Sequence, residues 1–388
     1  MCREPIRVLQ VVRAVPGGGA DSWLLKVARQ IDREHIKFDF CALWPPSASF
    51  HDEVEVLGGR IFPCLFSTNL PTFPLRFRRI LRAGRYDVVH SHVGWPSGVV
   101  LCQASLAGVP ARIAHSHTSN DFNPHTLLRN AWRAAMKAGI RKYTTAGLAV
   151  SGMAAEFLFG PHWSSDPRFR LFRCGIDLEP FRNAPSREEA RGELGIPVDA
   201  PVVGHVGRFV PEKNHGFLLQ VAREVLKSRP EVRFLMVGDG PLRPQIEAMA
   251  RDLGIEKRVV FAGSRSDAPR LMLSVMDVFA FPSIAEGFAI VLTEAQAAGL
   301  RCLVSDAVTS EASVVPGAVA YLPLSKGATP WAAALLEMLE KGLMGREMAL
   351  SILEQSDFDI RHSCSELTRM YEPRSATRRG STSAARAG

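Results

Sequence analysis

Two segments of this 388-residue chain, Val8–Ile31 and Val202–Val225, align without a gap at an offset of 194 residues. Each segment begins with an apolar run, turns at glycine or proline, and ends in an amphipathic pattern of helical period. A strand followed by a turn and a helix is the repeating unit of α/β domains with parallel sheets. A chain that begins this unit twice is therefore predicted to form two α/β domains of the same plan.

Apolar runs of strand length alternate with helical patterns through both halves of the chain. The runs of the first half are Lys37–Leu43, Arg60–Pro63, Asp87–His92, Ala111–His117, Gly147–Ser151 and Phe169–Arg173. Those of the second half are Val232–Val237, Arg258–Ala262, Asp277–Phe281, Cys302–Ser305 and Val319–Leu322. This alternation predicts a doubly wound parallel sheet, and hence a Rossmann-like domain, in each half.

Turn-forming residues at 183–186 mark the boundary between the halves. We expect an N-terminal domain over 1–182 and a second domain over 183–357. A helical pattern at 358–372 is expected to cross back onto the first domain. Residues 373–388 are small, polar and basic without apolar periodicity, so they are predicted to be disordered.

The net charge of +8 is unevenly distributed along the chain. Residues 1–182 hold 23 Lys and Arg against 14 Asp and Glu, whereas residues 183–372 hold 20 against 25. A basic first half indicates an anionic partner for that domain. Nucleic acid is not expected, because the chain lacks the interleaved aromatic and basic residues of nucleic-acid-binding proteins.

The sequence favours a cytoplasmic protein. It has no run of the ~18 to 20 apolar residues that a membrane-spanning helix needs, and no signal-peptide core at its start. Its seven cysteines lie far apart, mostly in apolar stretches, and form no Cys-x-x-Cys pair. Buried, reduced cysteines are therefore expected rather than disulfides, metal ligands or a nucleophile.

The strongest cluster of arginines lies in the segment Leu75–Arg85, where Phe77, Ile80 and Leu81 stand at helical spacing between them. Two interpretations remain open for this segment. A basic amphipathic helix can lie on an anionic membrane surface. An ordinary surface helix can instead use the same apolar residues to pack on its own sheet.

Two carboxylates, Glu286 and Glu294, flank a predicted strand-to-helix turn. The strand is Asp277–Phe281, and a helix is expected to open at Ile290. Free amides at a helix start attract phosphate, and carboxylates accept hydrogen bonds from pairs of hydroxyls. This combination suits a sugar nucleotide; the alternative is that both acids are solvated surface groups.

Two cations, Arg208 and Lys213, follow the first predicted strand of the second half. Ligands of doubly wound sheets bind beyond the carboxyl ends of the strands, so this loop and the Glu286 turn are expected to face one crevice. A guanidinium and an ammonium there would neutralise a diphosphate as it leaves. Otherwise they are two solvated loop cations.

Glycine-rich turns follow two of the predicted strands. Gly17-Gly18-Gly19 would let a ligand approach the backbone closely. The dinucleotide pattern Gly-x-Gly-x-x-Gly fails there because Ser22 fills its third place, and it fails at Gly238-Asp239-Gly240 because of Arg243. Hydride transfer with a nicotinamide cofactor is therefore disfavoured.

Two predicted strand ends carry the triplets His90-Ser91-His92 and His115-Ser116-His117. Residues i and i+2 of a strand face the same side, so a metal site is one interpretation of these triplets. No carboxylate stands at a convincing spacing to complete it. We expect no metal, and instead imidazoles that line a crevice, with one histidine of each triplet buried.

These motifs, in this order, resemble those of glycosyltransferase family 4, retaining enzymes of the GT-B fold, and particularly its bacterial exopolysaccharide and capsule enzymes. The resemblance spans nearly all of residues 1–372. The motifs that carry it are Gly17-Gly18-Gly19-Ala20, Asp87-Val88-Val89-His90-Ser91-His92, Ala114-His115-Ser116-His117, Cys174-Gly175-Ile176-Asp177, Val206-Gly207-Arg208 with Lys213, Val237-Gly238-Asp239-Gly240-Pro241 and the pair Glu286 and Glu294. The implied fold is two Rossmann-like domains that face a central cleft.

The resemblance also implies residue roles. Arg208 and Lys213 would bind the donor diphosphate, while Glu286 would bind the sugar hydroxyls and Glu294 the ribose. His117 would contact the donor sugar near the reacting carbon, and it forms the implied catalytic set with Arg208, Lys213 and Glu286. The remaining implied donor-binding positions are Gly18, Gly19, Gly207, Gly238, Gly287, Phe288, Ala289 and Ile290, the last three through their amides.

The resemblance further implies retention of anomeric configuration without a metal, with the leaving phosphate accepting the acceptor's proton. No cofactor is expected beyond a nucleotide sugar, with a UDP-sugar favoured, as co-substrate. The basic first domain would bind a glycan or polyprenyl-diphosphate-linked acceptor at the inner face of the plasma membrane.

Two residues depart from the family pattern: Cys174 replaces the usual Asn, and Ala289 replaces Gly or Pro. Neither change removes a charged group, so both bear on donor preference more than on activity. A non-catalytic GT-B protein that binds sugar nucleotides or scaffolds an assembly remains an alternative. A GT-B epimerase is a further one.

Overall fold

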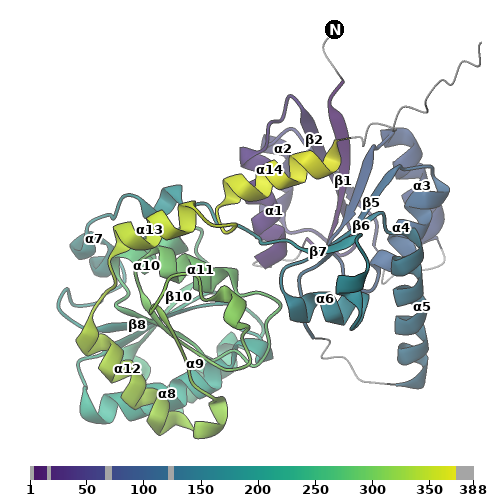
Figure 1. Cartoon of the computed structure of the whole chain (residues 1–388). Helices are drawn as coiled ribbons and strands as arrows, with labels where there is room; N and C mark the ends of the chain where they lie inside the picture. Colours follow the sequence, from purple (N-terminus) through teal and green to yellow (C-terminus); the bar gives the residue numbers. More distant parts are fainter. Residues whose placement is uncertain (1–3, 15–18, 66–71, 121–125, 373–388) are drawn as a thin grey trace, which may run out of the picture.

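The chain folds into two α/β domains, each built on one parallel sheet (Figure 1). The computed structural model describes residues 4–14, 19–65, 72–120 and 126–372. The predicted α/β class, with two doubly wound Rossmann-like domains, is confirmed. The tail at 373–388 lies outside the described residues.

The first sheet contains seven described strands in the order β3-β2-β1-β4-β5-β6-β7. They are β1 (Ile6–Val12), β2 (Ile36–Ala42), β3 (Ile61–Pro63), β4 (Val88–Ser91), β5 (Ala111–Ser116), β6 (Ala146–Ala149) and β7 (Phe169–Leu171). Neighbouring strands run parallel throughout. The strand order reverses at β1, and ligands of such sheets bind beyond the strand ends near this switch point.

Helices cover both faces of the first sheet (Figure 1). Those on one side are α1 (Gly19–Gln30) and α2 (Ala48–Val56), and those on the other are α3 (Phe73–Gly84), α4 (Ser97–Leu106) and α5 (Leu127–Tyr143). Helix α6 (Gly152–Phe159) follows β6. Burial on both faces explains why the strand sequences are almost continuously apolar.

The second sheet contains six described strands in the order β10-β9-β8-β11-β12-β13. They are β8 (Val202–Val206), β9 (Arg233–Val237), β10 (Val259–Gly263), β11 (Val278–Phe281), β12 (Arg301–Val304) and β13 (Val319–Tyr321). Its helices are α7 (Arg187–Gly192), α8 (His215–Ser228), α9 (Arg243–Asp252), α10 (Ala268–Ser274), α11 (Ile290–Ala297), α12 (Ala328–Lys341) and α13 (Arg346–Glu354). The strands β1 and β8, which open the two repeats, both stand at the switch points of their sheets.

The predicted strands differ from the observed ones by one or two residues at their ends. Ser151 is the clearest correction, because the sequence predicts that it ends a strand, whereas it caps the N-terminus of helix α6. Its hydroxyl accepts a hydrogen bond from the Ala154 amide at 3.2 Å. An apolar run does not reveal where a strand gives way to a capping residue.

The chain crosses between the domains twice, and the two crossings pair with each other. The Ile176 amide donates to the Phe358 carbonyl at 2.7 Å, and the Ile360 amide donates to the Ile176 carbonyl at 3.0 Å. A Cβ at Gly175 would lie 2.4 Å from the Asp359 backbone, so glycine is required at this approach. Helix α14 (Ile360–Tyr371) then lies beside α1 of the first domain (Figure 1).

Helix α3 holds the basic segment, and its apolar side faces its own domain. Phe77 and Leu81 are buried. Arg76, Arg79 and Arg82 are exposed on the outer side. Phe77 and Leu81 therefore pack on the protein, while these arginines and Leu75 face solvent.

Five of the six described cysteines are buried: Cys41, Cys64, Cys174, Cys302 and Cys364. All six, Cys102 included, are free thiols. Among the described residues, no helix combines the length and the apolar character that crossing a bilayer requires.

Candidate active site between the two domains

Lys213 and Glu286 form an ion pair beyond the carboxyl ends of the neighbouring strands β8 and β11. The Lys213 ammonium lies 2.6 Å from Glu286 Oε1 and 4.8 Å from the centroid of the Phe281 ring. Ser283 Oγ donates to the same Glu286 oxygen at 2.6 Å. The side chains of Lys213 and Glu286 are only 18% and 12% exposed, so their charges are concentrated at one point of limited solvent access.

The Glu286 loop is held directly against the first domain. Ser119 Oγ donates to the Glu286 carbonyl and Ser151 Oγ donates to the Gly287 carbonyl, both at 2.6 Å. A Cβ at Gly287 would lie 2.1 Å from the His117 carbonyl oxygen, so only glycine allows this approach. The predicted catalytic residues His117, Lys213 and Glu286 are therefore gathered where the two domains meet.

Glu294 lies on α11 and is paired with a residue that the sequence did not single out. Lys26, on α1 of the first domain, places its ammonium 2.7 Å from Glu294 Oε1. Burial alone would lower the pKa of Lys26, but the charge and hydrogen bond of Glu294 outweigh burial and raise that pKa. No sequence signal connects Lys26 to Glu294, because the contact joins two domains.

Arg208 follows β8 and is half-buried. Unlike Lys213, it forms no ion pair with any residue in the part of the chain that the structure describes. The neighbouring Gly207 is approached by Gly238, whose φ is 137° and whose Cβ would lie 2.1 Å from the Gly207 carbonyl. These predicted donor-binding glycines therefore also allow the loops after β8 and β9 to pack together.

The amides at the start of α11 are not all available for a phosphate. The Ile290 amide donates to the Phe288 carbonyl at 3.1 Å, a contact that a phosphate would have to replace. The Phe288 and Ala289 amides have no acceptor within the described ranges. The Phe288 ring stacks on Phe358 at 5.4 Å, where the chain crosses back to the first domain.

The glycine-rich first loop is only partly described. Gly19 is the first residue of α1, is exposed, and has no heavy atom within 4 Å of a Cβ placed on it. Gly18 lies outside the described residues.

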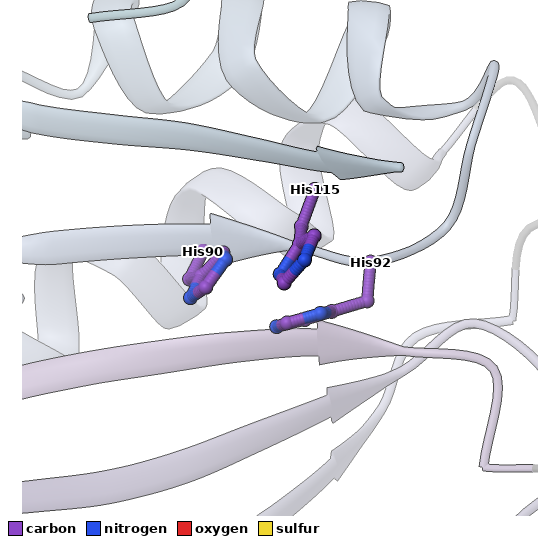
Figure 2. A group of neighbouring side chains, drawn as sticks. All are labelled: His90, His92 and His115. Carbon is purple, nitrogen blue, oxygen red and sulfur yellow. The ribbon is translucent and has the colours of Figure 1, made fainter. Parts of the chain in front are cut away.

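The two His-Ser-His triplets bring four imidazoles together at the ends of β4 and β5. Figure 2 shows three of them, His90, His92 and His115, with their rings gathered in one cluster. The ring centroids of His90 and His92 are 4.1 Å apart, and those of His115 and His117 are 4.0 Å apart. Three of the four are buried rather than one in each triplet, and only His117 is half-buried.

Burial keeps these histidines neutral. It lowers the pKa of His117 to about 3. Burial, followed by the proximity of the other imidazoles, lowers the pKa of His90, His92 and His115 well below the usual range. His117 can therefore offer a hydrogen bond or accept one at neutral pH, but it does not act there as a cationic acid.

Two groups of side chains in the cluster are compact enough to hold a metal ion: His90 with His92 and His115, and His115 with His117 and Cys174. Neither group includes a carboxylate. Both nitrogens of His92 are already hydrogen-bonded, to Gln10 and to His117, each at 2.9 Å. The donor set is thus occupied by protein contacts that a metal would have to displace.

Cys174, which departs from the family pattern, touches this cluster. Its sulfur lies 4.0 Å from His117 Nδ1 and is fully buried. The departure therefore lies beside the predicted catalytic histidine.

Comparison with known families matches both domains. The family described as Glycosyltransferase Family 4 matches residues 17–180, and Glycosyl transferases group 1 matches residues 186–351. The matched ranges contain every predicted catalytic residue, with His117 in the first and Arg208, Lys213 and Glu286 in the second.

Three relatives illustrate the range of similar proteins. Putative glycosyltransferase EpsF of Bacillus subtilis (strain 168) is 32% identical over 94% of this chain and 96% of its own length. The capsular polysaccharide biosynthesis glycosyltransferase CapH of Staphylococcus aureus is 26% identical over 94% and 98%. The UDP-Gal:alpha-D-GlcNAc-diphosphoundecaprenol alpha-1,3-galactosyltransferase of Escherichia coli is 28% identical over 59% and 60%.

Among solved structures, Anabaena Alr3699/HepE in complex with UDP-glucose has the same fold. Its TM-score is 0.77 at 20% identity, over 94% of this chain and 98% of that one.

Proposed function

Because the chain belongs to glycosyltransferase family 4 and has the GT-B fold, we propose that it transfers a hexose from a nucleotide sugar to a glycan or lipid-linked acceptor. The transfer retains anomeric configuration and needs no metal. One observation carries the proposal: the loop that holds Glu286, which is paired with Lys213, packs against the first domain, where Gly287 approaches the His117 carbonyl. A donor bound there would touch groups from both domains at once.

The cations supply the positive charge that the reaction needs. As the bond between the sugar carbon C1 and the phosphate oxygen breaks, negative charge grows on the leaving diphosphate. Arg208, which has no ion pair among the described residues, and Lys213 stand ready to stabilise that charge before it develops. In the same step the acceptor hydroxyl attacks C1 from the face that the phosphate leaves, and its proton passes to the phosphate oxygen.

The carboxylates orient the donor. Lys213 and Ser283 bind one oxygen of Glu286, so the other remains able to accept from sugar hydroxyls. Glu294 likewise uses one oxygen for Lys26 and can accept from the ribose with the other. His117 contacts the sugar near C1.

A UDP-sugar is the favoured donor, a proposal supported by the HepE complex with UDP-glucose and by the UDP-galactose named for the E. coli relative. The acceptor proposal, a lipid diphosphate carrying a glycan, is supported by that relative's name and by the exposed arginines of α3. The CapH name supports a place in cell-surface polysaccharide synthesis.

A donor panel tests the proposal. Purified protein is incubated with UDP-, GDP- and ADP-sugars in EDTA, with a lipid-linked acceptor extract, and release of nucleoside diphosphate is followed. We expect release from one UDP-sugar that EDTA does not reduce. Binding without release would favour the non-catalytic alternative, and recovery of an isomerised sugar would favour the epimerase. Release that stops in EDTA would contradict the metal-free step.

We also propose that the protein works in the cytoplasm at the inner face of the plasma membrane. The exposed arginines Arg76, Arg79 and Arg82 would bind anionic headgroups mainly by charge, since Phe77 and Leu81 are buried and Leu75 is the large apolar residue of α3 that is exposed. Binding to vesicles with anionic lipid is therefore expected to fall steeply with added salt. Reversing the three charges to glutamate should abolish it, and the same change at Lys227, Arg251 and Lys257 of the second domain serves as control. Equal binding to neutral vesicles would contradict this proposal.

A further inference from the structure

The last residue of helix α14 is buried inside the first domain, far along the chain from what it touches. Tyr371 is only 1% exposed. Its hydroxyl lies 2.7 Å from His90 Nδ1 and 3.1 Å from the side-chain nitrogen of Gln10 on β1. The helix that returns from the second domain therefore ends on the histidine cluster.

Hydrogen bonds continue from Gln10 to the predicted active site. Gln10 Oε1 lies 2.9 Å from His92 Nε2, and His92 Nδ1 lies 2.9 Å from His117 Nε2. Gln10 and His92 are buried. Four side chains, Tyr371, Gln10, His92 and His117, thus form one connected chain, which we call the Tyr371 chain.

The direction of each hydrogen bond in this chain follows from the chemistry of the amide. The Gln10 nitrogen can only donate, so the Tyr371 oxygen accepts there. The Gln10 oxygen can only accept, so His92 carries its proton on Nε2. A neutral imidazole has one N–H, which makes His92 Nδ1 an acceptor. His117 must then carry its proton on Nε2.

We propose that Tyr371 and Gln10 are positioning residues that fix His117 in the Nε2–H tautomer, leaving its Nδ1 as the hydrogen-bond acceptor. The buried surroundings agree, because they keep both imidazoles of the chain, His92 and His117, neutral. The contact now made at Nδ1 is the weak one with the Cys174 sulfur at 4.0 Å, which a sugar hydroxyl would readily replace.

The consequence for catalysis rests on the proposed function. If His117 contacts the donor sugar, it accepts a hydrogen bond from a sugar hydroxyl and does not donate one. Helix α14 then has a chemical effect on the site through Tyr371. Without the Tyr371 hydroxyl, the side-chain amide of Gln10 is free to flip and donate its N–H to His92. That flip would switch His92 and His117 to their other tautomers and place the His117 proton on Nδ1.

The tautomer itself is the first measurement. In full-length protein labelled with ¹⁵N-histidine, long-range ¹H–¹⁵N correlation shows which ring nitrogen bears the proton, and a His117→Asn spectrum assigns the signal. We expect the Nε2–H form for His117 in the unaltered protein. The Nδ1–H form there would overturn the proposal without need of any variant.

The second measurement uses Tyr371→Phe, which removes the hydroxyl and keeps the ring. We expect a mixture of the two His117 tautomers, and a fall of about two- to tenfold in kcat for donor hydrolysis, in proportion to the Nε2–H fraction, with KM for the donor little changed. Tyr86→Phe is the matched control, since the Tyr86 hydroxyl is buried in the same domain but donates to Asp39 at 2.7 Å. It should leave the His117 signal unchanged.

Two results would contradict the proposal: an unaltered His117 tautomer in Tyr371→Phe, or uptake of one Zn²⁺ per chain that displaces the His92–His117 hydrogen bond. Because the NMR readout needs no donor, a shifted tautomer in a protein that hydrolyses no donor would refute the proposed function and leave the Tyr371 chain standing.

Discussion

Replacing Lys213 with methionine is expected to slow donor cleavage by about 100- to 1,000-fold, the usual loss when one preorganised group that stabilises developing charge is removed. Glu286→Gln should have an effect of similar size, because the amide cannot hold the ammonium and the sugar hydroxyls as the carboxylate does. The measurement is the rate of nucleoside diphosphate release at saturating donor. Lys227→Met, which breaks an exposed Lys–Glu pair of the same domain, should leave the rate unchanged.

The double variant separates a structural ion pair from a catalytic one. Each single change leaves a largely buried charge without its partner and should cost about 2 kcal/mol of the free energy of unfolding. In Lys213→Met/Glu286→Gln no unpaired charge remains, so much of that stability should return. The activity should not return. Recovery of activity together with stability would mean that the pair only holds the loop in place.

Acid is expected to destabilise the first domain. In the folded state burial lowers the pKa of His90, His92, His115 and His117, whereas the unfolded chain takes up protons near pH 6.5. The unfolded state thus binds more protons below that pH, so stability falls as pH falls. For His117 the loss continues to about pH 3, its folded pKa. Each histidine contributes about 1.4 kcal/mol per pH unit.

Where all four histidines are protonated in the unfolded chain and neutral in the folded one, the free energy of unfolding falls by about 5 kcal/mol per pH unit. This loss is comparable to the total stability of many domains. Urea unfolding between pH 7.5 and 5 measures it. Trp23 reports locally, since its ring lies 5.8 Å from His115. His90→Gln should reduce the pH dependence by about one quarter, and His162→Gln, at an exposed site, should not change it. A flat profile would show that the histidines titrate in the folded state.

The sequence predicted the parts of the site that depend on strand ends. Loops that follow neighbouring parallel strands meet at one edge of a sheet. The pattern of apolar runs was therefore enough to predict that Lys213 and Glu286 lie close together. The same reasoning placed the two histidine triplets side by side. It did not reveal how many of the histidines are buried, because burial depends on what packs over the strand ends.

Contacts between elements far apart in the chain were not predictable in the same way. Lys26 meets Glu294 across 268 residues, and Tyr371 meets Gln10 across 361. The position of a lysine or a tyrosine within a helix does not predict which distant residue it contacts. Likewise, the sequence around Phe77 is compatible with a membrane-facing or a core-facing helix, and the burial of Phe77 in the structure shows that its side chain faces the core.

The sequence by itself determined the two doubly wound domains, the order of their strands along the chain, and the charged residues at the strand ends. These follow from local periodicity, which each segment carries alone. Only the tertiary structure decided that Gly287 presses on His117, that Lys26 holds Glu294, and that the returning helix ends on the histidine cluster. Such contacts depend on how two finished domains and a crossing helix pack, and no local pattern of residues encodes that packing.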